Sequence, residues 1–157
     1  MTTEQLKDYI ASRFPVMMTL LETGRREPMY EVKAGQLLEV CRALRDDETL
    51  KFNYLCNIGA VDTQERLEIV YSIASVPNRL RLDFKVVLPR EGASIESVQE
   101  IWPAANWYER EMWELYGVDV KAHDNLKRFL LPDDWDKGHP MRKDWDDPDF
   151  VRFPEIE

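Results

Sequence analysis

Three segments in the middle of the chain alternate apolar and polar residues with a period of two. The apolar positions are Leu50, Phe52, Tyr54, Cys56 and Ile58, then Leu67, Ile69, Tyr71 and Ile73, then Leu80, Leu82, Phe84 and Val86. Because side chains alternate across a strand, each segment predicts a strand with one core face and one polar face. Residues 59–64 and 77–78 lie between the segments and suit hairpin turns. The pattern therefore predicts a three-stranded antiparallel meander.

Two amphipathic stretches before the meander predict the helices that cover its core face. Their apolar positions are Leu6, Tyr9, Ile10 and Phe14, then Leu37, Leu38, Cys41 and Leu44. Thr2 or Thr3 can cap the first helix, and Pro15 ends it. Short apolar runs at 16–21 and 29–32 predict two further strands. We expect a two-layer α+β domain, in the order helix, strand, strand, helix and three strands, with a largely antiparallel sheet.

A further helix is predicted from Pro103, at its first position, to Gly117, just past its end. Its apolar side would carry Trp107, Tyr108, Met112, Leu115 and Tyr116. Arg110 and Glu114 have the i,i+4 spacing of a surface ion pair, whereas Glu109 and Glu111 point to different sides of a helix. We therefore interpret these side chains as charges or ion pairs on the helix surface, in preference to a pair of carboxylates that carries out acid–base catalysis.

The sequence changes character after this helix, which divides the chain into a domain at 1–120 and a tail at 121–157. The tail has seventeen charged residues, prolines at 132, 140, 148 and 154, and no helical or strand period. It also carries Trp135, Trp145, Phe150 and Phe153, although solvated tails are poor in aromatic residues. Part of the tail can fold back on the domain. We expect the rest to follow the surface of a partner protein.

Composition excludes several classes of function. A net charge of −9 disfavours nucleic-acid binding, which relies on clustered Lys and Arg. Two cysteines are too few for an iron–sulfur cluster or a cysteine-based zinc site within the chain. The sequence has no glycine-rich loop that opens a helix, no targeting segment and no apolar run of membrane-spanning length. We therefore expect a soluble, cytosolic chain without a site for NAD or flavin.

Both histidines lie in the tail, among several aspartates. These residues are His123 and His139, with Asp124, Asp133, Asp134, Asp136 and Asp144. They could hold zinc or non-haem iron, but the histidines are sixteen positions apart in irregular chain, so structural or interfacial roles are preferred. The motif 138–144 is interpreted as a turn followed by docking charges. Phosphate binding by this motif is the weaker alternative.

Taken together, these segments resemble a family signature. The resemblance is carried by 109–118 (EREMWELYGV), His123, 126–132 (LKRFLLP) and 138–144 (GHPMRKD). In this order they are similar to the C subunit of proton-pumping NADH-quinone oxidoreductase, respiratory complex I, also called the 30 kDa subunit family. The matching positions are Glu109, Arg110, Glu111, Glu114, Gly117, His123, Arg128, Pro132, Gly138, His139, Pro140, Arg142, Lys143 and Asp144.

The resemblance implies a non-redox structural subunit of the hydrophilic arm, peripheral on the cytoplasmic side of the bacterial inner membrane. FMN, iron–sulfur clusters and quinone would be bound by other subunits, and the tail would pack along the quinone-site D subunit. The complex passes electrons from NADH to quinone and couples this transfer to proton translocation. The matching residues would have roles in shape and docking, with no catalytic, cofactor-binding or metal-binding residue.

One segment departs from the family pattern, and two alternatives stay open. Where the family often has Gly-His-Pro, this chain has Ala122-His123-Asp124, so the turn can differ while the histidine is kept. Related subunits occur in membrane-bound hydrogenases and ferredoxin-driven quinone reductases, and these residues do not distinguish the electron donors. A free-standing metal enzyme that uses the histidines and aspartates is the remaining alternative.

Overall fold

A five-stranded sheet in the order β1-β2-β5-β4-β3 forms the centre of the computed structural model, which describes residues 1–149. The strands are β1 (Met18–Leu21), β2 (Met29–Val32), β3 (Tyr54–Asp62), β4 (Arg66–Ser75) and β5 (Leu80–Pro89). Neighbouring strands are antiparallel except β2 and β5, which are parallel. The predicted largely antiparallel sheet is confirmed.

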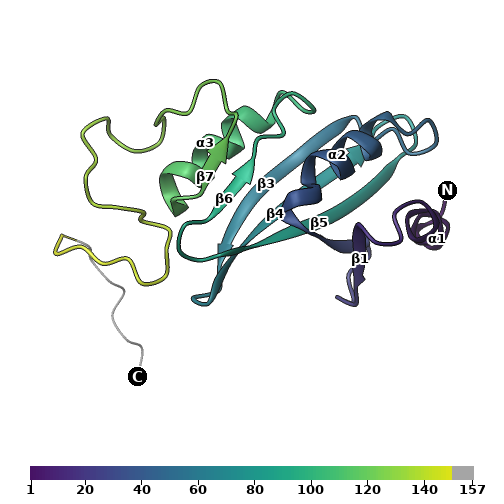
Figure 1. The fold of residues 1–157 in the computed structure, drawn as a ribbon, viewed down its shortest axis with the longest axis horizontal. Helices are drawn as coiled ribbons and strands as arrows, with labels where there is room; N and C mark the ends of the chain where they lie inside the picture. Colours follow the sequence, from purple (N-terminus) through teal and green to yellow (C-terminus); the bar gives the residue numbers. More distant parts are fainter. Residues whose placement is uncertain (150–157) are drawn as a thin grey trace.

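The helices begin and end near the predicted positions. They are α1 (Thr3–Arg13), α2 (Leu37–Asp46), which follows the short 3-10 turn η1 (Ala34–Gln36), and α3 (Ala105–Tyr116). Thr2 caps α1 in a capping box with Gln5, so two backbone N–H groups at the helix start are satisfied. α2 lies across one face of the sheet, which completes the predicted two-layer α+β architecture (Figure 1).

The core lies between the sheet and the helices. Along β4 and β5, the predicted apolar positions are all buried, and Tyr71 and Phe84 stack with ring centroids 4.7 Å apart. Leu37, Cys41 and Leu44 of α2 pack into the same core. Burying side chains of this kind stabilises the fold by roughly 1.5–3 kcal/mol each.

The predicted alternation holds at Leu50, Phe52 and Ile58 but is wrong at the start of β3. Tyr54 is exposed and Leu55 is buried, because the register shifts between Leu55 and Asn57 and changes which residues face the core. The strand also continues through Gly59 to Asp62, so the hairpin turn spans only 63–65 rather than 59–64.

A second, two-stranded sheet was missed by the sequence interpretation. β6 (Ser94–Glu96) and β7 (Asp119–Lys121) pair in parallel, and α3 connects them. Each strand has three residues, which is too short for an alternation to be recognisable. The helix itself starts at Ala105 rather than at Pro103.

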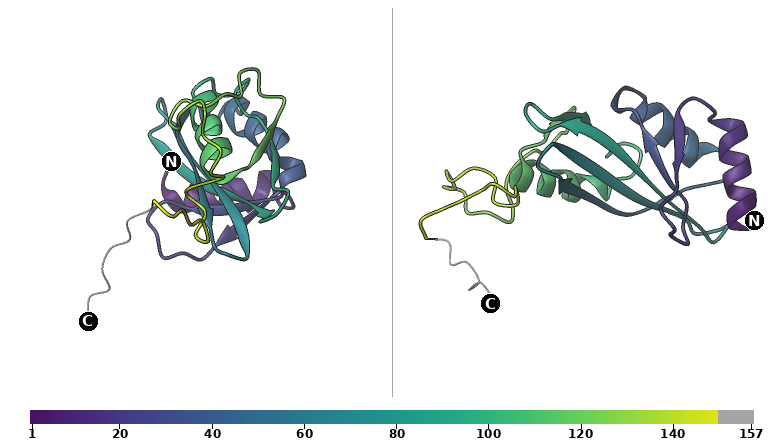
Figure 2. Two further views of the ribbon diagram at one scale, coloured as in Figure 1. Left: turned by 90° about the vertical axis from the view of Figure 1, so that its left-hand side faces the viewer. Right: turned by 90° about the horizontal axis from the view of Figure 1, so that it is seen from below.

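The molecule is elongated, and its two ends are built differently (Figures 1 and 2). One end carries α1, whereas α3, the small sheet and the tail form the other end. Within residues 1–149, no helix is both long and apolar enough to cross a membrane.

Candidate docking site formed by the last helix and the tail

Helix α3 buries charged side chains, contrary to the prediction that its charges lie on the surface. Glu109, Arg110 and Glu114 are all buried, while Trp107 of the predicted apolar side is 58% exposed. The i,i+4 ion pair predicted between Arg110 and Glu114 is wrong, because both side chains bind backbone groups of the tail instead. The spacing of charges along a helix cannot show that another segment covers them.

Arg110 holds the first part of the tail. Its Nε donates to the carbonyl of Lys127 at 2.8 Å, and a terminal guanidinium nitrogen donates to the carbonyl of Arg128 at 3.2 Å. The guanidinium also lies over the rings of Trp107 and Phe129, 4.9 and 4.7 Å from their centroids. The planar guanidinium can stack and donate at the same time, which a lysine at this position could not do.

Glu114 holds the next residues of the tail. Its carboxylate accepts the backbone N–H groups of Phe129, Leu130 and Leu131 at 3.4, 2.9 and 3.2 Å. A buried carboxylate requires such donors, because an unpaired buried charge is strongly destabilising. These three N–H groups therefore fix the conformation of the tail beside α3.

Gly117 lets the tail return to the end of α3. It caps the helix with φ of +72°, as predicted for a residue just past the helix end. The His139 ring occupies the space that a Cβ on this residue would fill, and its Nδ1 lies 3.1 Å from the carbonyl oxygen of Glu114. A glycine is therefore needed for both its backbone conformation and the close approach of the histidine.

The carboxylate of Glu109 is hydrogen-bonded in the domain interior. It accepts from the Ser97 hydroxyl at 2.6 Å and from the Val98 N–H at 2.7 Å, and burial raises its pKa to about 7. His123 accepts from the Asn125 N–H through Nδ1, so its Nε2 carries the proton that is donated to the Asn106 carbonyl at 3.1 Å. The His123 Nε2 is also 3.9 Å from the Glu109 carboxylate.

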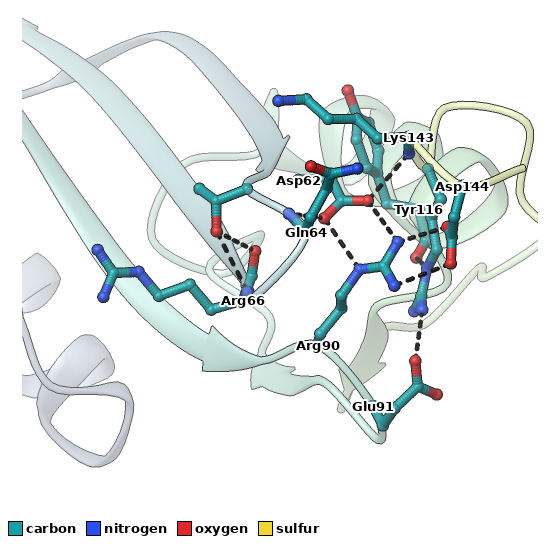
Figure 3. A network of polar contacts seen from close by, with 10 residues as sticks. Asp62, Gln64, Arg66, Arg90, Glu91, Tyr116, Lys143 and Asp144 are labelled. Atoms are coloured by element: carbon teal, nitrogen blue, oxygen red, sulfur yellow. Dashed lines mark hydrogen bonds and ion pairs between the residues drawn. The ribbon is translucent and has the colours of Figure 1, made fainter.

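A network of charges fixes the end of the 138–144 motif on the domain (Figure 3). Arg90 donates through Nε and a terminal nitrogen to both carboxylate oxygens of Asp62, at 3.0 and 2.8 Å, and it also pairs with Asp144. The Lys143 N–H donates to Asp62 at 3.0 Å. The Arg90 guanidinium and the backbone donors hold the pKa of Asp62 well below its usual range. Sequence reasoning missed Asp62 and Arg90, because nothing local distinguishes them from other surface charges.

Arg142 reaches the same end of α3. Its Nε donates to the carbonyl of Tyr116 at 2.8 Å, and it pairs with Glu91 at 3.2 Å. The neighbouring Met141 N–H donates to the carbonyl of Leu115 at 3.1 Å. The Arg142 side chain and the Lys143 backbone thus hold the tail on its own domain, although the motif was interpreted as charges for docking on a partner.

The remaining predicted residues shape the tail or lie on its surface. Arg128 donates to the Asp133 carbonyl at 3.0 Å, and Gly138 has φ of +77° and accepts from the Trp135 indole N–H. Pro132 accepts from the Trp135 N–H through its carbonyl, Pro140 is half-buried, and Glu111 is exposed.

The residues proposed as metal ligands are not brought together. His123 binds the Asn106 carbonyl and His139 binds the Glu114 carbonyl, eight positions apart along α3. Within residues 1–149, no group of three or more His, Cys, Asp or Glu side chains could hold a metal ion. Phe150 and Phe153, which were predicted to pack against the domain or a partner protein, lie outside the described residues.

Large apolar side chains stay exposed on this end of the molecule. Trp107 of α3 is 58% exposed, and Leu130 and Met141 of the tail are 53% and 52% exposed. Between α3 and the tail lies a cavity of about 270 Å³, lined in part by Trp113, Trp135 and His139. Exposed apolar side chains on a segment of fixed conformation are typical of a protein–protein contact.

The fold and the site define a class of protein: a two-layer α+β domain whose last helix fixes an irregular tail through buried charges. Two solved structures share the fold. A chain of an archaeal membrane-bound sulfane sulfur reductase aligns with a TM-score of 0.79 and 24% identity, over 98% of this chain and 96% of that one. A trypsin-resistant fragment of Nqo5 aligns with a TM-score of 0.65 and 22% identity, over 80% and 100%.

Sequence comparisons identify the family. A sequence model of the respiratory-chain NADH dehydrogenase 30 kDa subunit matches residues 30–151. The NADH-quinone oxidoreductase C subunit of Citrifermentans bemidjiense is 42% identical over 124 residues, which span 77% of this chain and 75% of the relative. The C/D subunit of Acidiphilium cryptum is 33% identical over 150 residues, which span 89% of this chain and 25% of the longer relative. The chain belongs to the 30 kDa subunit family of respiratory NADH dehydrogenase, as its signature residues predicted.

Proposed function

We propose that this chain is a non-redox structural subunit of the hydrophilic arm of NADH-quinone oxidoreductase. It supports electron transfer from NADH, through FMN and iron–sulfur clusters on other subunits, to quinone, coupled to proton translocation. It lies on the cytoplasmic side of the bacterial inner membrane and joins the membrane only through the complex. Family membership and the match to relatives named as the C subunit support this proposal.

The partner of the tail in this proposal is the D subunit. The observation that carries it is the fixed tail, whose Leu130 and Met141 side chains remain exposed, as does Trp107 of α3. Glu114 and Arg110 hold the backbone in one conformation before any partner binds, which reduces the ordering cost of association. The C/D relative supports the same pairing, because its name joins the two subunits in one chain.

Truncation after Pro132 tests whether the tail binds the D subunit. It keeps the N–H groups that bind Glu114 but removes His139, Arg142 and Asp144, together with the exposed Met141. The domain should still fold because its core lies between the sheet and helices, while the D subunit should no longer co-purify with the chain. Thermal unfolding of the truncated chain provides the control. Co-purification at the wild-type ratio would contradict the proposal.

The electron donor is tested separately. The fold is shared with a chain of a sulfane sulfur reductase, so a related membrane complex with another donor is the alternative. Co-purification of subunits that bind flavin and NADH, and NADH oxidation by the complex but not by the isolated chain, are expected. A nickel-containing large subunit in the purified complex would favour the hydrogenase alternative.

A further inference from the structure

A second cavity lies at the end of the molecule opposite the tail. It has a volume of about 850 Å³ and is formed by the start of α1, the segment 26–28, and the adjoining ends of β3, β4 and β5. Figure 2 shows α1 at this end, separated from α3 and the tail by the length of the sheet. The cavity is therefore distinct from the docking site described above.

Three arginines of this cavity differ from every other arginine in the described chain. Arg26, Arg79 and Arg81 line the cavity, and all three are exposed. Within residues 1–149 their side chains make no hydrogen bond or ion pair, whereas the side chain of each of the other arginines makes at least one. One carboxylate, Glu27, also lines the cavity, so the charged side chains of its wall sum to two positive charges.

Ser75 supplies an unpaired polar group in the same wall. Its residue is only 1% exposed, and its hydroxyl has no hydrogen-bond partner in the described part of the chain. A buried hydroxyl without a partner costs free energy, and a carboxylate oxygen would accept from it. The hydroxyl needs a hydrogen-bond acceptor and the three arginines lack an anionic partner, so a carboxylate would satisfy both.

The rim of the cavity is apolar rather than purely polar. Tyr54 is 56% exposed and Val76 is 63% exposed, and both line the cavity with the buried Leu6 and Leu80. A small inorganic anion would leave this apolar surface uncovered. Tyrosine and arginine together are typical of protein–protein contacts, so the lining fits a peptide with both carboxylate and apolar side chains.

We propose that this cavity binds an acidic segment of a neighbouring subunit, so that the chain contacts partners at both of its ends. The inference rests on the proposed function, because it requires that the chain be part of an assembly. The positive charge of the cavity is complementary to an acidic segment. The chain as a whole carries a net charge of −9, yet its unpaired arginines gather in this cavity. Such a positive region attracts an acidic segment and repels segments of like charge.

A photo-cross-linking residue at Val76 identifies the occupant in the assembled complex. p-Benzoylphenylalanine at this position should form a cross-link to a segment of another subunit that is rich in Asp or Glu, identified by mass spectrometry. The same residue at Val16, which is 75% exposed but does not line the cavity, is the matched control and should not cross-link to that segment.

Two double variants test the charge. Arg79→Gln with Arg81→Gln should lower the cross-link yield about fivefold, whereas Arg79→Lys with Arg81→Lys should retain most of it, because exposed pairs depend mainly on charge. Equal yields in the two double variants would overturn the inference. So would a product that joins two copies of this chain, a cross-linked segment without carboxylates, or no cross-link in a complex that still co-purifies. If no other subunit co-purifies with the unsubstituted chain, the proposed function fails as well. Electrophoresis of the purified sample shows which subunits are present, and so distinguishes failure of the proposed function from failure of this inference alone.

Discussion

Glu109 has no exposed surface, yet its carboxyl group has only two short hydrogen bonds, from Ser97 and Val98. Burial raises its pKa to about 7, so it binds a proton more tightly in the folded chain than in the unfolded one. His123 Nε2 faces it at 3.9 Å, and burial, with a smaller contribution from the charge of Glu109, raises the pKa values of Cys41 and Tyr71. At the residue scale, this carboxyl is a source of pH-dependent stability.

The free energy of unfolding of the chain should fall as the pH rises from 4.5 to about 7. The folded pKa of about 7 lies above the ordinary value of 4.5, so ionisation of Glu109 costs stability between these two pH values, by up to about 3 kcal/mol. Glu109→Gln should remove this slope, measured by urea unfolding between pH 4.5 and 8. Glu111→Gln changes an exposed carboxyl on the same helix and should keep the slope. Parallel stability curves for Glu109→Gln and the unsubstituted chain would contradict the assignment.

Ala122 is in a conformation that its side chain disfavours. Its φ of +58° lies in the left-handed region, at the position where the family often has glycine. Ala122→Gly should raise the free energy of unfolding by about 0.5 kcal/mol, since relief of strain exceeds the added entropy of the unfolded chain. Ala104→Gly, at φ of −61°, should give no gain. Thermal unfolding of both variants measures the difference, and a loss of stability in Ala122→Gly would disprove the strain.

At the element scale, the strands with long alternation were predictable, and the buried charges of α3 were not. β4 and β5 follow their sequence pattern along their whole length. β3 does not, because a register shift at Leu55 changes the faces of its residues, and such a shift leaves no mark in the alternation. The predicted surface pair of Arg110 and Glu114 failed because both bind a segment more than ten residues later in the chain.

Glu114→Ala should release the tail from α3. Without the carboxylate, the N–H groups of residues 129–131 lose their acceptor, so their hydrogen exchange should speed up at least tenfold. Glu111→Ala, on the exposed side of the same helix, should leave this exchange unchanged. Unchanged protection of residues 129–131 in Glu114→Ala would show that other contacts hold the tail.

At the scale of the whole molecule, the family could be predicted from the signature residues, and the comparisons confirm it. The docking roles given to those residues stay predictions, as does the division of the chain at residue 120. Several signature side chains, including Arg110, Glu114 and Arg142, bind the backbone of their own chain. In the proposed docking, their contribution would be to fix the tail, while the exposed apolar side chains would make the contact.

Hydroxyl-radical footprinting of the free chain and of the purified complex is the most direct test of whether α3 and the tail dock on the D subunit. Trp107, Leu130 and Met141 are oxidisable and more than half exposed in the free chain. We predict that their oxidation rates fall several-fold in the complex, because they are covered there by the D subunit. Equal oxidation rates for these three residues in the free chain and in the complex would contradict the proposed contact.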